Sequence, residues 1–242
     1  MIFLPQTEST NLALRALSNA ENMENLSVVW TDFQTKGRGQ AGNSWESELG
    51  MNLLCSILFF PTHLAANQSF VVAELTALCV KNTLGRYVSD ISVKWPNDIY
   101  HQHKKISGIL IENDITGSRI TRSIIGIGIN LNQTVFKSEA PNPVSLASII
   151  GHTVERTEIL NQLHADFKLF ISLLEAKGIN YLHQQYCDSL YHRNGFHAYK
   201  DKDGYFEARI HSIEPTGRLI LERRNGLLSR YDFKEVETLT PT

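Results

Sequence analysis

The sequence predicts an α+β protein, with a mixed sheet and flanking helices followed by a small β-barrel. Strand-like runs rich in Ile and Val outnumber the helical patterns up to residue 190, which favours a mixed α+β arrangement. From about Gly195 the chain changes to short β-prone pieces separated by turn signals, as expected for a small barrel or meander. We therefore expect one domain at 1–190 and a second at 191–242.

The first predicted elements surround a glycine-rich loop. Ser9 precedes Leu and Ala residues at helical spacing and is expected to be the N-cap of a helix. Two strands, 26–34 and 52–60, then flank the loop. A helix and three strands rich in Ile and Val are expected next, at 67–87, 91–100, 104–114 and 121–133.

The second half is expected to hold one long helix and several short strands. Residues 133–145 contain two prolines and no clear period, which predicts a loop. Apolar residues recur at helical spacing between 157 and 175, and Gly178 is placed to end that helix. The β-prone pieces of the C-terminal domain lie at 196–200, 205–213, 218–224 and 227–233.

Composition argues against several classes of function. The 23 Lys and Arg residues are interleaved with 25 Asp and Glu residues, for a net charge of −2, so neither nucleic acid nor an anionic membrane is an expected partner. No apolar run approaches the roughly 20 residues of a membrane span, and the N-terminus lacks signal-peptide features. We expect a cytoplasmic protein. The three cysteines are widely spaced in apolar stretches, which favours reduced core thiols over disulfides or zinc.

The glycine loop, residues 37–45 (GRGQAGNSW), is the most informative segment. Its three glycines let backbone N–H groups converge on an anion, and Arg38 adds a planar fork of donors. The spacing also fits G-x-G-x-x-G, but a dinucleotide fingerprint needs a helix after the loop and an acidic residue about twenty positions on. Here a strand follows, and no Asp or Glu occurs between Leu49 and Ala73. We therefore expect another kind of anion site.

Polar residues also interrupt the strands that follow. In KWPND, residues 94–98, polar groups gather where a proline stops strand pairing, which indicates either a site or a turn capped by Asn and Asp. In the next strand, alternation predicts that Lys105 shares one face with Ser107 and Ile109. Gly108 would let another group approach this strand closely.

Two further patterns lie near these strands. His101 and His103 could bind a metal, but a hairpin turn explains them better, because no third ligand is near in sequence. In GIGIN, residues 126–130, two glycines share one face of a strand. This predicts that a ligand or another part of the chain packs closely against it.

Five segments together resemble the catalytic domain of the biotin protein ligases. In the family's order they are STN (9–11), QTKGRGQAGNSW (34–45), KWPND (94–98), KISGILIE (105–112) and GIGIN (126–130). The resemblance implies a class II synthetase-like biotin/lipoate ligase domain followed by an SH3-like barrel, as a monomer or homodimer. It also implies that ATP and Mg²⁺ activate biotin to biotinyl-5′-AMP. A lysine of a biotin carboxyl carrier protein then takes the biotinyl group.

The resemblance further implies roles for individual residues. Lys105, Arg38 and Asp98 are expected to be catalytic: Lys105 would contact the biotin carboxylate and the phosphate, and Asp98 would orient the acceptor lysine or help to hold Mg²⁺. The residues expected around biotin are Ser9, Thr10, Asn11, Gln34, Gly37, Arg38, Gly39, Gln40, Lys105 and Gly108. Those expected around ATP and the adenylate are Trp45, Lys94, Asn97, Asp98 and Asn130.

This chain departs from the family pattern in two places. Many members have arginines at the positions of Gln40 and Asn43, so we expect fewer cations to retain the adenylate here. Some relatives carry an upstream DNA-binding domain, whereas the predicted first helix begins within ten residues of Met1. We expect no repressor activity.

Two alternatives stay open: a lipoate or octanoate ligase of the same fold, and a non-catalytic biotin-binding module. The glycine–arginine loop, KWPND and the C-terminal barrel together favour the biotin ligase.

Overall fold

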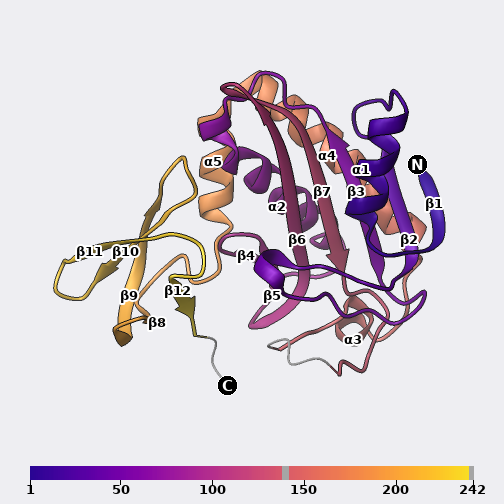
Figure 1. Cartoon of the computed structure of the whole chain (residues 1–242). Coiled ribbons are helices and arrows are strands. Elements are labelled where there is room, and N and C mark those ends of the chain that lie inside the picture. Colours follow the sequence, from indigo (N-terminus) through magenta and orange to yellow (C-terminus); the bar gives the residue numbers. More distant parts are fainter. Residues whose placement is uncertain (138–141, 240–242) are drawn as a thin grey trace.

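The central sheet has seven strands and is mixed. The computed structural model describes residues 1–137 and 142–239. The strands are β1 (Ile2–Thr7), β2 (Val28–Gln34), β3 (Leu53–Phe59), β4 (Ile91–Lys94), β5 (Asp98–His101), β6 (Lys104–Thr116) and β7 (Arg119–Ile129). Across the sheet they lie in the order β1, β2, β3, β7, β6, β5, β4 (Figure 1). β1 and β2 are parallel, whereas the other neighbouring strands are antiparallel. The predicted α+β class is confirmed.

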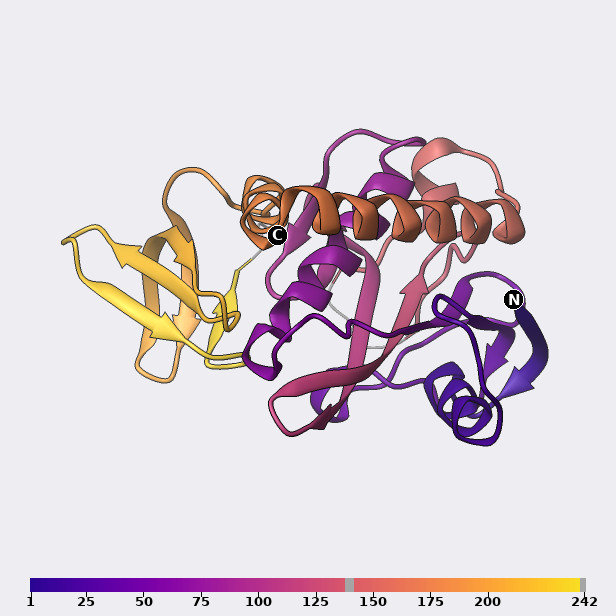
Figure 2. The same cartoon turned by 90° about the horizontal axis from the view of Figure 1, so that it is seen from above.

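Helices cover both faces of this sheet. They are α1 (Thr10–Ala20), α2 (Phe70–Leu84), α3 (Leu146–Ile150), α4 (Arg156–Lys177) and α5 (Ile179–Asp188). α2, α4 and α5 form a layer on one face and α1 lies on the other (Figure 2). Successive strand residues point to opposite faces: Ile125 belongs to the main core beneath the helix layer, whereas Ile124 packs with Leu14 of α1. Ser9 and Gly178 flank α1 and α4 as expected, although the Ser9 side chain makes no capping bond.

The C-terminal segment forms a second, antiparallel sheet. Its strands are β8 (His197–Asp201), β9 (Gly204–Ile213), β10 (Leu219–Arg223), β11 (Leu228–Tyr231) and β12 (Val236–Thr238). They lie in the order β11, β10, β9, β8, β12, beside α5 and the β4 edge of the large sheet (Figure 1). Tyr199, Ala208 and Leu221 are buried inside it. The β-rich C-terminal unit is confirmed, with β12 added, while the division at 190 stays a prediction.

Several elements differ from expectation. Residues 91–100, predicted as one strand, form the β4–β5 hairpin, because the proline in the Trp95–Asn97 turn has no N–H to extend a ladder. β1 was not predicted; it is an edge strand, where Pro5 is tolerated. α5 was also missed, although Leu182 and Tyr186 lie at helical spacing and are fully buried. The predicted loop at 133–145 lies partly outside the described residues.

The predicted alternation at the start of β6 is wrong. β5 pairs with both Lys105 and Ser107, which leaves Ile106 without a partner across the ladder. Such a β-bulge adds one residue to the strand, so the side chains before it change face relative to those after it. Lys105 therefore lies on the face of Gly108, whereas Ser107 and Ile109 are buried. The bulge turns this lysine away from the core.

The remaining expectations concern membranes and thiols. Within residues 1–137 and 142–239, no helix is both long and apolar enough to cross a membrane. Cys55 and Cys79 are buried and Cys187 is half-buried, and all three are free thiols, as predicted. Burial raises the pKa of Cys55 to about 12, so this thiol stays protonated.

Candidate active site

One cavity brings together residues from all five sequence motifs. Its volume is about 910 Å³, near the upper end of the range of about 300–1,000 Å³ typical of small-molecule sites. It lies where the start of α1, the glycine loop, the β4–β5 turn, β6 and β7 meet. Every predicted site residue except Gly37 lines it: Ser9, Thr10, Asn11, Gln34, Arg38, Gly39, Gln40, Trp45, Lys94, Asn97, Asp98, Lys105, Gly108 and Asn130.

We call Ser9, Thr10, Asn11, Gln34 and Arg38 the α1 end of the cavity. Ser9, Thr10 and Asn11 are only 2–3% exposed. The Gln34 side-chain oxygen accepts hydrogen bonds from the Thr10 backbone N–H at 2.8 Å and from its hydroxyl at 3.1 Å. Because the first N–H groups of a helix have no partner inside the helix, this bond fastens the start of α1 to the end of β2.

Ser56 and Glu112, which sequence reasoning missed, complete the α1 end. The Ser56 hydroxyl, fully buried on β3, lies 2.6 Å from Asn11 Oδ1 and 2.7 Å from Thr10 Oγ1. Glu112 Oε2 accepts a hydrogen bond from Asn11 Nδ2 at 3.0 Å. Since the amide oxygen only accepts and the amide nitrogen only donates, these partners fix the orientation of Asn11. A lone serine in the apolar run 53–60 and the final glutamate of KISGILIE were the available signals.

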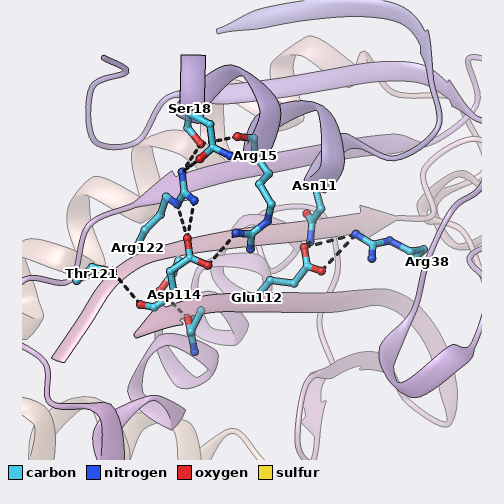
Figure 3. Close-up of polar contacts among 11 residues, drawn as sticks. Asn11, Arg15, Ser18, Arg38, Glu112, Asp114, Thr121 and Arg122 are labelled. Atoms are coloured by element: carbon cyan, nitrogen blue, oxygen red, sulfur yellow. Dashed lines mark hydrogen bonds and ion pairs between the residues drawn. The ribbon is translucent and has the colours of Figure 1, made fainter. Parts of the chain in front are cut away.

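Arg38 points toward the same Glu112 carboxylate (Figure 3). Its Nη2 lies 3.3 Å from Oε1 and 3.5 Å from Oε2. The two side chains are 38% and 28% exposed, so water screens this ion pair in part.

The glycine loop closes on itself through backbone hydrogen bonds. The Gly39 N–H donates to the Asn43 carbonyl at 2.6 Å, and the Trp45 N–H donates to the Gly37 carbonyl at 3.0 Å. A short 3-10 turn, Gln40–Gly42, lies between them. A Cβ at Gly37 would lie 2.6 Å from the Trp45 carbonyl oxygen. Gly37, which does not line the cavity, therefore permits the loop to close.

Glycines form the floor of the cavity. A Cβ at Gly126 would lie 2.5 Å from Asn11 Oδ1, and one at Gly128 would lie 2.5 Å from the Trp45 ring. The same ring lies 2.8 Å from a Cβ built at Gly108. The predicted close packing against GIGIN is confirmed, and its partners are two cavity side chains. Trp45 Nε1 is buried and has no hydrogen-bond partner among the described residues.

We call Lys94, Asn97, Asp98 and Lys105 the hairpin end of the cavity. Lys105 Nζ lies 2.8 Å from Asp98 Oδ1 and 5.7 Å from the centre of the Trp45 ring. The Lys105 and Asp98 side chains are 24% and 28% exposed. A half-buried ammonium therefore faces the cavity beside the Asp98 carboxylate.

Lys94 lies deeper at the same end. Its Nζ is 3.3 Å from the Tyr100 hydroxyl and 5.0 Å from the centre of that ring. Burial lowers the pKa of Lys94, while the negative charges of Asp98 and Glu237 act in the opposite direction. The hairpin end thus holds two ammonium groups, one of them partly desolvated.

Asn97 and Asn130 fasten the backbone around this end, and both are almost fully buried. The Asn97 amide donates to the Ile109 carbonyl. The Asn130 N–H donates to the Ile106 carbonyl at 2.9 Å, and its carbonyl accepts from the Leu146 N–H at 3.0 Å. KWPND is therefore both a turn and part of the cavity wall, which joins the two interpretations that the sequence left open.

The C-terminal sheet also reaches the cavity, which the sequence did not predict. Phe233 and Glu237, from the segment between β11 and β12 and from β12, lie on the wall. Trp95 Nε1 donates to the Gly217 carbonyl at 2.8 Å, and its ring meets that of Phe233 at 6.4 Å between centres. These contacts join positions more than a hundred residues apart, so no local motif could reveal them.

The described residues contain no group of three or more His, Cys, Asp or Glu side chains placed to hold a metal ion. His101 ends β5, and His103 lies in the tight turn before β6, where Gln102 has a φ of 52°. His103 Nδ1 lies 2.8 Å from the Tyr191 hydroxyl. The hairpin-turn interpretation of these histidines is confirmed.

Comparison with known proteins points to one family. A model of the biotin/lipoate A/B protein ligase family matches residues 3–130. The biotin–acetyl-CoA-carboxylase ligase of Paracoccus denitrificans is 31% identical over 181 residues, which cover 72% of this chain and 74% of the relative. The bifunctional ligase/repressor BirA of Escherichia coli is 26% identical over 96% of this chain and 72% of its own length.

A solved structure agrees at the level of the fold. The biotin protein ligase of Aquifex aeolicus, in complex with biotin and ATP, superimposes with a TM-score of 0.79 and 24% identity, covering 99% of this chain and 98% of that one. More than half of the chain matches the family model, and the Paracoccus relative is alike over most of both lengths. The chain therefore belongs to the biotin/lipoate A/B protein ligase family.

Proposed function

We propose that this protein is an ATP-dependent biotin protein ligase. It forms biotinyl-5′-AMP and transfers the biotinyl group to a lysine of a biotin carboxyl carrier protein. The observation that carries the proposal is the meeting, in one cavity, of a buried hydrogen-bonding end and a cationic end. The Paracoccus relative named as a biotin ligase and the Aquifex structure with biotin and ATP support the choice of ligands.

The α1 end is suited to a neutral, polar ring. The ureido group of biotin offers two N–H donors and one carbonyl acceptor, and Thr10, Asn11 and Gln34 supply both kinds of partner from buried positions. A site built from buried polar groups rejects an analogue that leaves them unpaired. We assign biotin recognition to this end, with Ser9 and the backbone of residues 38–40 around the ring.

The hairpin end is suited to the activation step. The biotin carboxylate attacks the α-phosphate of ATP, an acyl–phosphate bond forms, and pyrophosphate leaves. This step brings two anions together, so cations must neutralise charge that concentrates in the transition state. Two unit charges 4 Å apart interact by about 4 kcal/mol at an effective dielectric of about 20, or roughly a thousandfold in rate. We assign this stabilisation to Lys105, with Arg38 from the loop.

The remaining cavity residues serve the nucleotide and the second step. Lys94, Asn97 and Asn130 are assigned to ATP, and the Trp45 ring to the adenylate. In the transfer step the lysine amine attacks the acyl carbon, AMP leaves, and the amine loses a proton.

The hairpin end could also hold Mg²⁺, because this ion is usually bound by one or two carboxylates together with substrate phosphates. Asp98 is such a carboxylate, 28% exposed at the hairpin end. When bound, Mg²⁺ would neutralise phosphate charge. Asp98 is assigned either to this ion or to orienting the acceptor lysine.

The test of the first step is exchange of labelled pyrophosphate into ATP with biotin, lipoate or octanoate as the acid. We expect exchange with biotin alone. Exchange with lipoate or octanoate and not with biotin would identify a lipoate-type ligase of the same fold. Calorimetric binding of biotin without any exchange would identify a non-catalytic module. Either result would overturn the proposal.

The test of the second step uses a biotin carboxyl carrier domain as acceptor. Intact-mass spectrometry should show one added biotinyl group when ATP and biotin are both present. A carrier with its acceptor lysine replaced by arginine is the matched control and should gain no mass. A wild-type carrier that stays unmodified, with exchange intact, would limit the activity to adenylate formation.

A further inference from the structure

The side chains at the α1 end form one continuous chain of polar contacts. In order they are Gln34, Thr10, Ser56, Asn11, Glu112 and Arg38. Four of them line the cavity, whereas Ser56 and Glu112 stand behind it. Glu112 is the member that joins the start of α1 to the glycine loop, because it contacts both Asn11 and Arg38 (Figure 3).

We propose that Glu112 is a positioning residue that tethers the glycine loop to β6 before the ligand binds and fixes the amide of Asn11. The tether presents Arg38 and Asn11 to biotin in one arrangement, so less conformational freedom is lost when the ligand arrives. The identity of that ligand rests on the proposed function. The tether itself rests on the contacts of Glu112.

The composition of the loop explains why a tether is needed. Between Gly37 and Ser44 the sequence has three glycines and almost no apolar side chains, so packing contributes little to its order. Arg38 is the cation of this stretch, since Gln40 and Asn43 are neutral. A carboxylate on the rigid β6 strand can hold that cation from a fixed position.

A neighbouring carboxylate shows how Glu112 differs from a purely structural ion pair. Asp114 lies two residues further along β6 and binds Arg15 at 2.7 Å and Arg122 at 2.6 Å (Figure 3). Neither arginine lines the cavity. The Glu112–Arg38 contacts, at 3.3 and 3.5 Å, are longer and use one nitrogen, Nη2, of a group with five N–H donors. Donors of Arg38 therefore remain for a ligand while the tether holds.

The experiment measures the loop and the ligand separately in Glu112→Gln, which keeps the size and removes the charge. The loop is followed by limited digestion of the ligand-free protein with proteinase K, with cut sites mapped by mass spectrometry. We expect cleavage within residues 36–45 to become about fivefold faster, the limit for a partly exposed ion pair. In biotin-dependent pyrophosphate exchange, KM for biotin should rise about fivefold while KM for ATP stays unchanged.

Asp114→Asn is the matched control, because it removes a carboxylate from the same face of the same strand. It should lower thermal stability and leave both loop cleavage and KM for biotin at wild-type values. Salt gives a second readout: 0.5 M NaCl should speed loop cleavage in the wild type and not in Glu112→Gln, which has no charge to screen.

Two results would overturn the tether. One is wild-type loop cleavage and wild-type KM for biotin in Glu112→Gln. The other is a lower KM, which would show that Glu112 competes with the ligand for Arg38. If the wild type shows no exchange with biotin, the proposed function fails, and the digestion series still decides whether the tether exists.

Discussion

The two ends of the cavity are held in place by different interactions. At the α1 end, Thr10 and Asn11 are 2–3% exposed and are held by hydrogen bonds, Thr10 to Gln34 and Asn11 to Ser56 and to the Glu112 carboxylate. At the hairpin end, Lys105 and Asp98 are 24% and 28% exposed and form an ion pair. Buried hydrogen-bonding side chains such as Thr10 and Asn11 recognise shape and hydrogen-bonding pattern, whereas half-exposed charges can stabilise changing charge. Under the proposed function, the α1 end selects the ligand, and Lys105 at the hairpin end serves the reaction.

Removing the Lys105 ammonium from the hairpin end should have the largest effect. In Lys105→Ala we expect kcat for biotin-dependent pyrophosphate exchange to fall about a thousandfold, because the role proposed for the ammonium is to stabilise charge in the transition state. The fold should persist, since a partly exposed ion pair contributes about 1 kcal/mol or less. Exchange kinetics and a thermal melt measure the two quantities.

Lys104→Ala is the control for this prediction, because Lys104 is the preceding residue and is exposed. It should exchange at the wild-type rate. If Lys105→Ala keeps near-normal exchange, the assignment of the activation step to the hairpin end is wrong. The proposed difference between the two ends then fails as well.

Two glycines of β7 allow the biotin and ATP assignments to be tested within one strand, because they contact different cavity side chains. A Cβ at Gly126 would meet Asn11 at 2.5 Å, and one at Gly128 would meet the Trp45 ring at 2.5 Å. Forcing an extra carbon into such a contact costs about 1–3 kcal/mol. We therefore expect Gly126→Ala to raise KM for biotin, and Gly128→Ala to raise KM for ATP, each by roughly 5- to 150-fold.

Each glycine variant is the control for the other, since they lie two residues apart and insert the same atom. Substrate titrations in the exchange assay measure both KM values. If both variants raise KM for biotin and KM for ATP equally, the two ends do not bind the two substrates separately, and the proposed division of roles is wrong.

Much of the hairpin end could be predicted from the sequence, because its residues lie within short motifs. KWPND marked a strand break and KISGILIE marked a lysine beside a glycine, and both lie at the cavity. The face of Lys105 could not be predicted by alternation, because the bulge at Ile106 depends on pairing with β5. Register is a property of two strands and cannot be read from one.

The α1 end shows the opposite limit. Ser56 and Glu112 belong to strands whose local patterns suggest ordinary sheet positions, and their roles arise from Asn11, 45 and 101 residues away. β1 was missed for a similar reason, since its pairing with β2 decides its structure. α5, in contrast, carried a local signal in Leu182 and Tyr186. Contacts between residues far apart in the sequence, more than weak local secondary-structure propensities, explain why these features could not be predicted.

The smallest effect should come from Lys94, and it tests whether charge is specific to the hairpin end. Burial lowers the pKa of Lys94 from its ordinary value of 10.5, so the unfolded chain binds this proton more tightly than the folded one. At neutral pH the buried ammonium therefore reduces stability, and this cost disappears as pH rises from the lowered pKa toward 10.5. Lys94→Met should raise Tm at pH 7 by about 2–4 °C, or about 1 kcal/mol, and the gain should shrink as the pH rises.

Ser56→Ala gives the comparison at the α1 end, because it removes a buried hydroxyl and no charge. Ser56→Ala should lower Tm, and the decrease should be the same at pH 7 and at the higher pH values at which Lys94→Met is measured. Thermal melts of both variants across that pH range measure the difference.

A lower Tm for Lys94→Met at pH 7 would mean that the attraction of Asp98 and Glu237 and the Tyr100 contact outweigh burial. The charges of the hairpin end would then stabilise the fold in the absence of ligand. The ammonium available for a phosphate would be that of Lys105, whose side chain is 24% exposed.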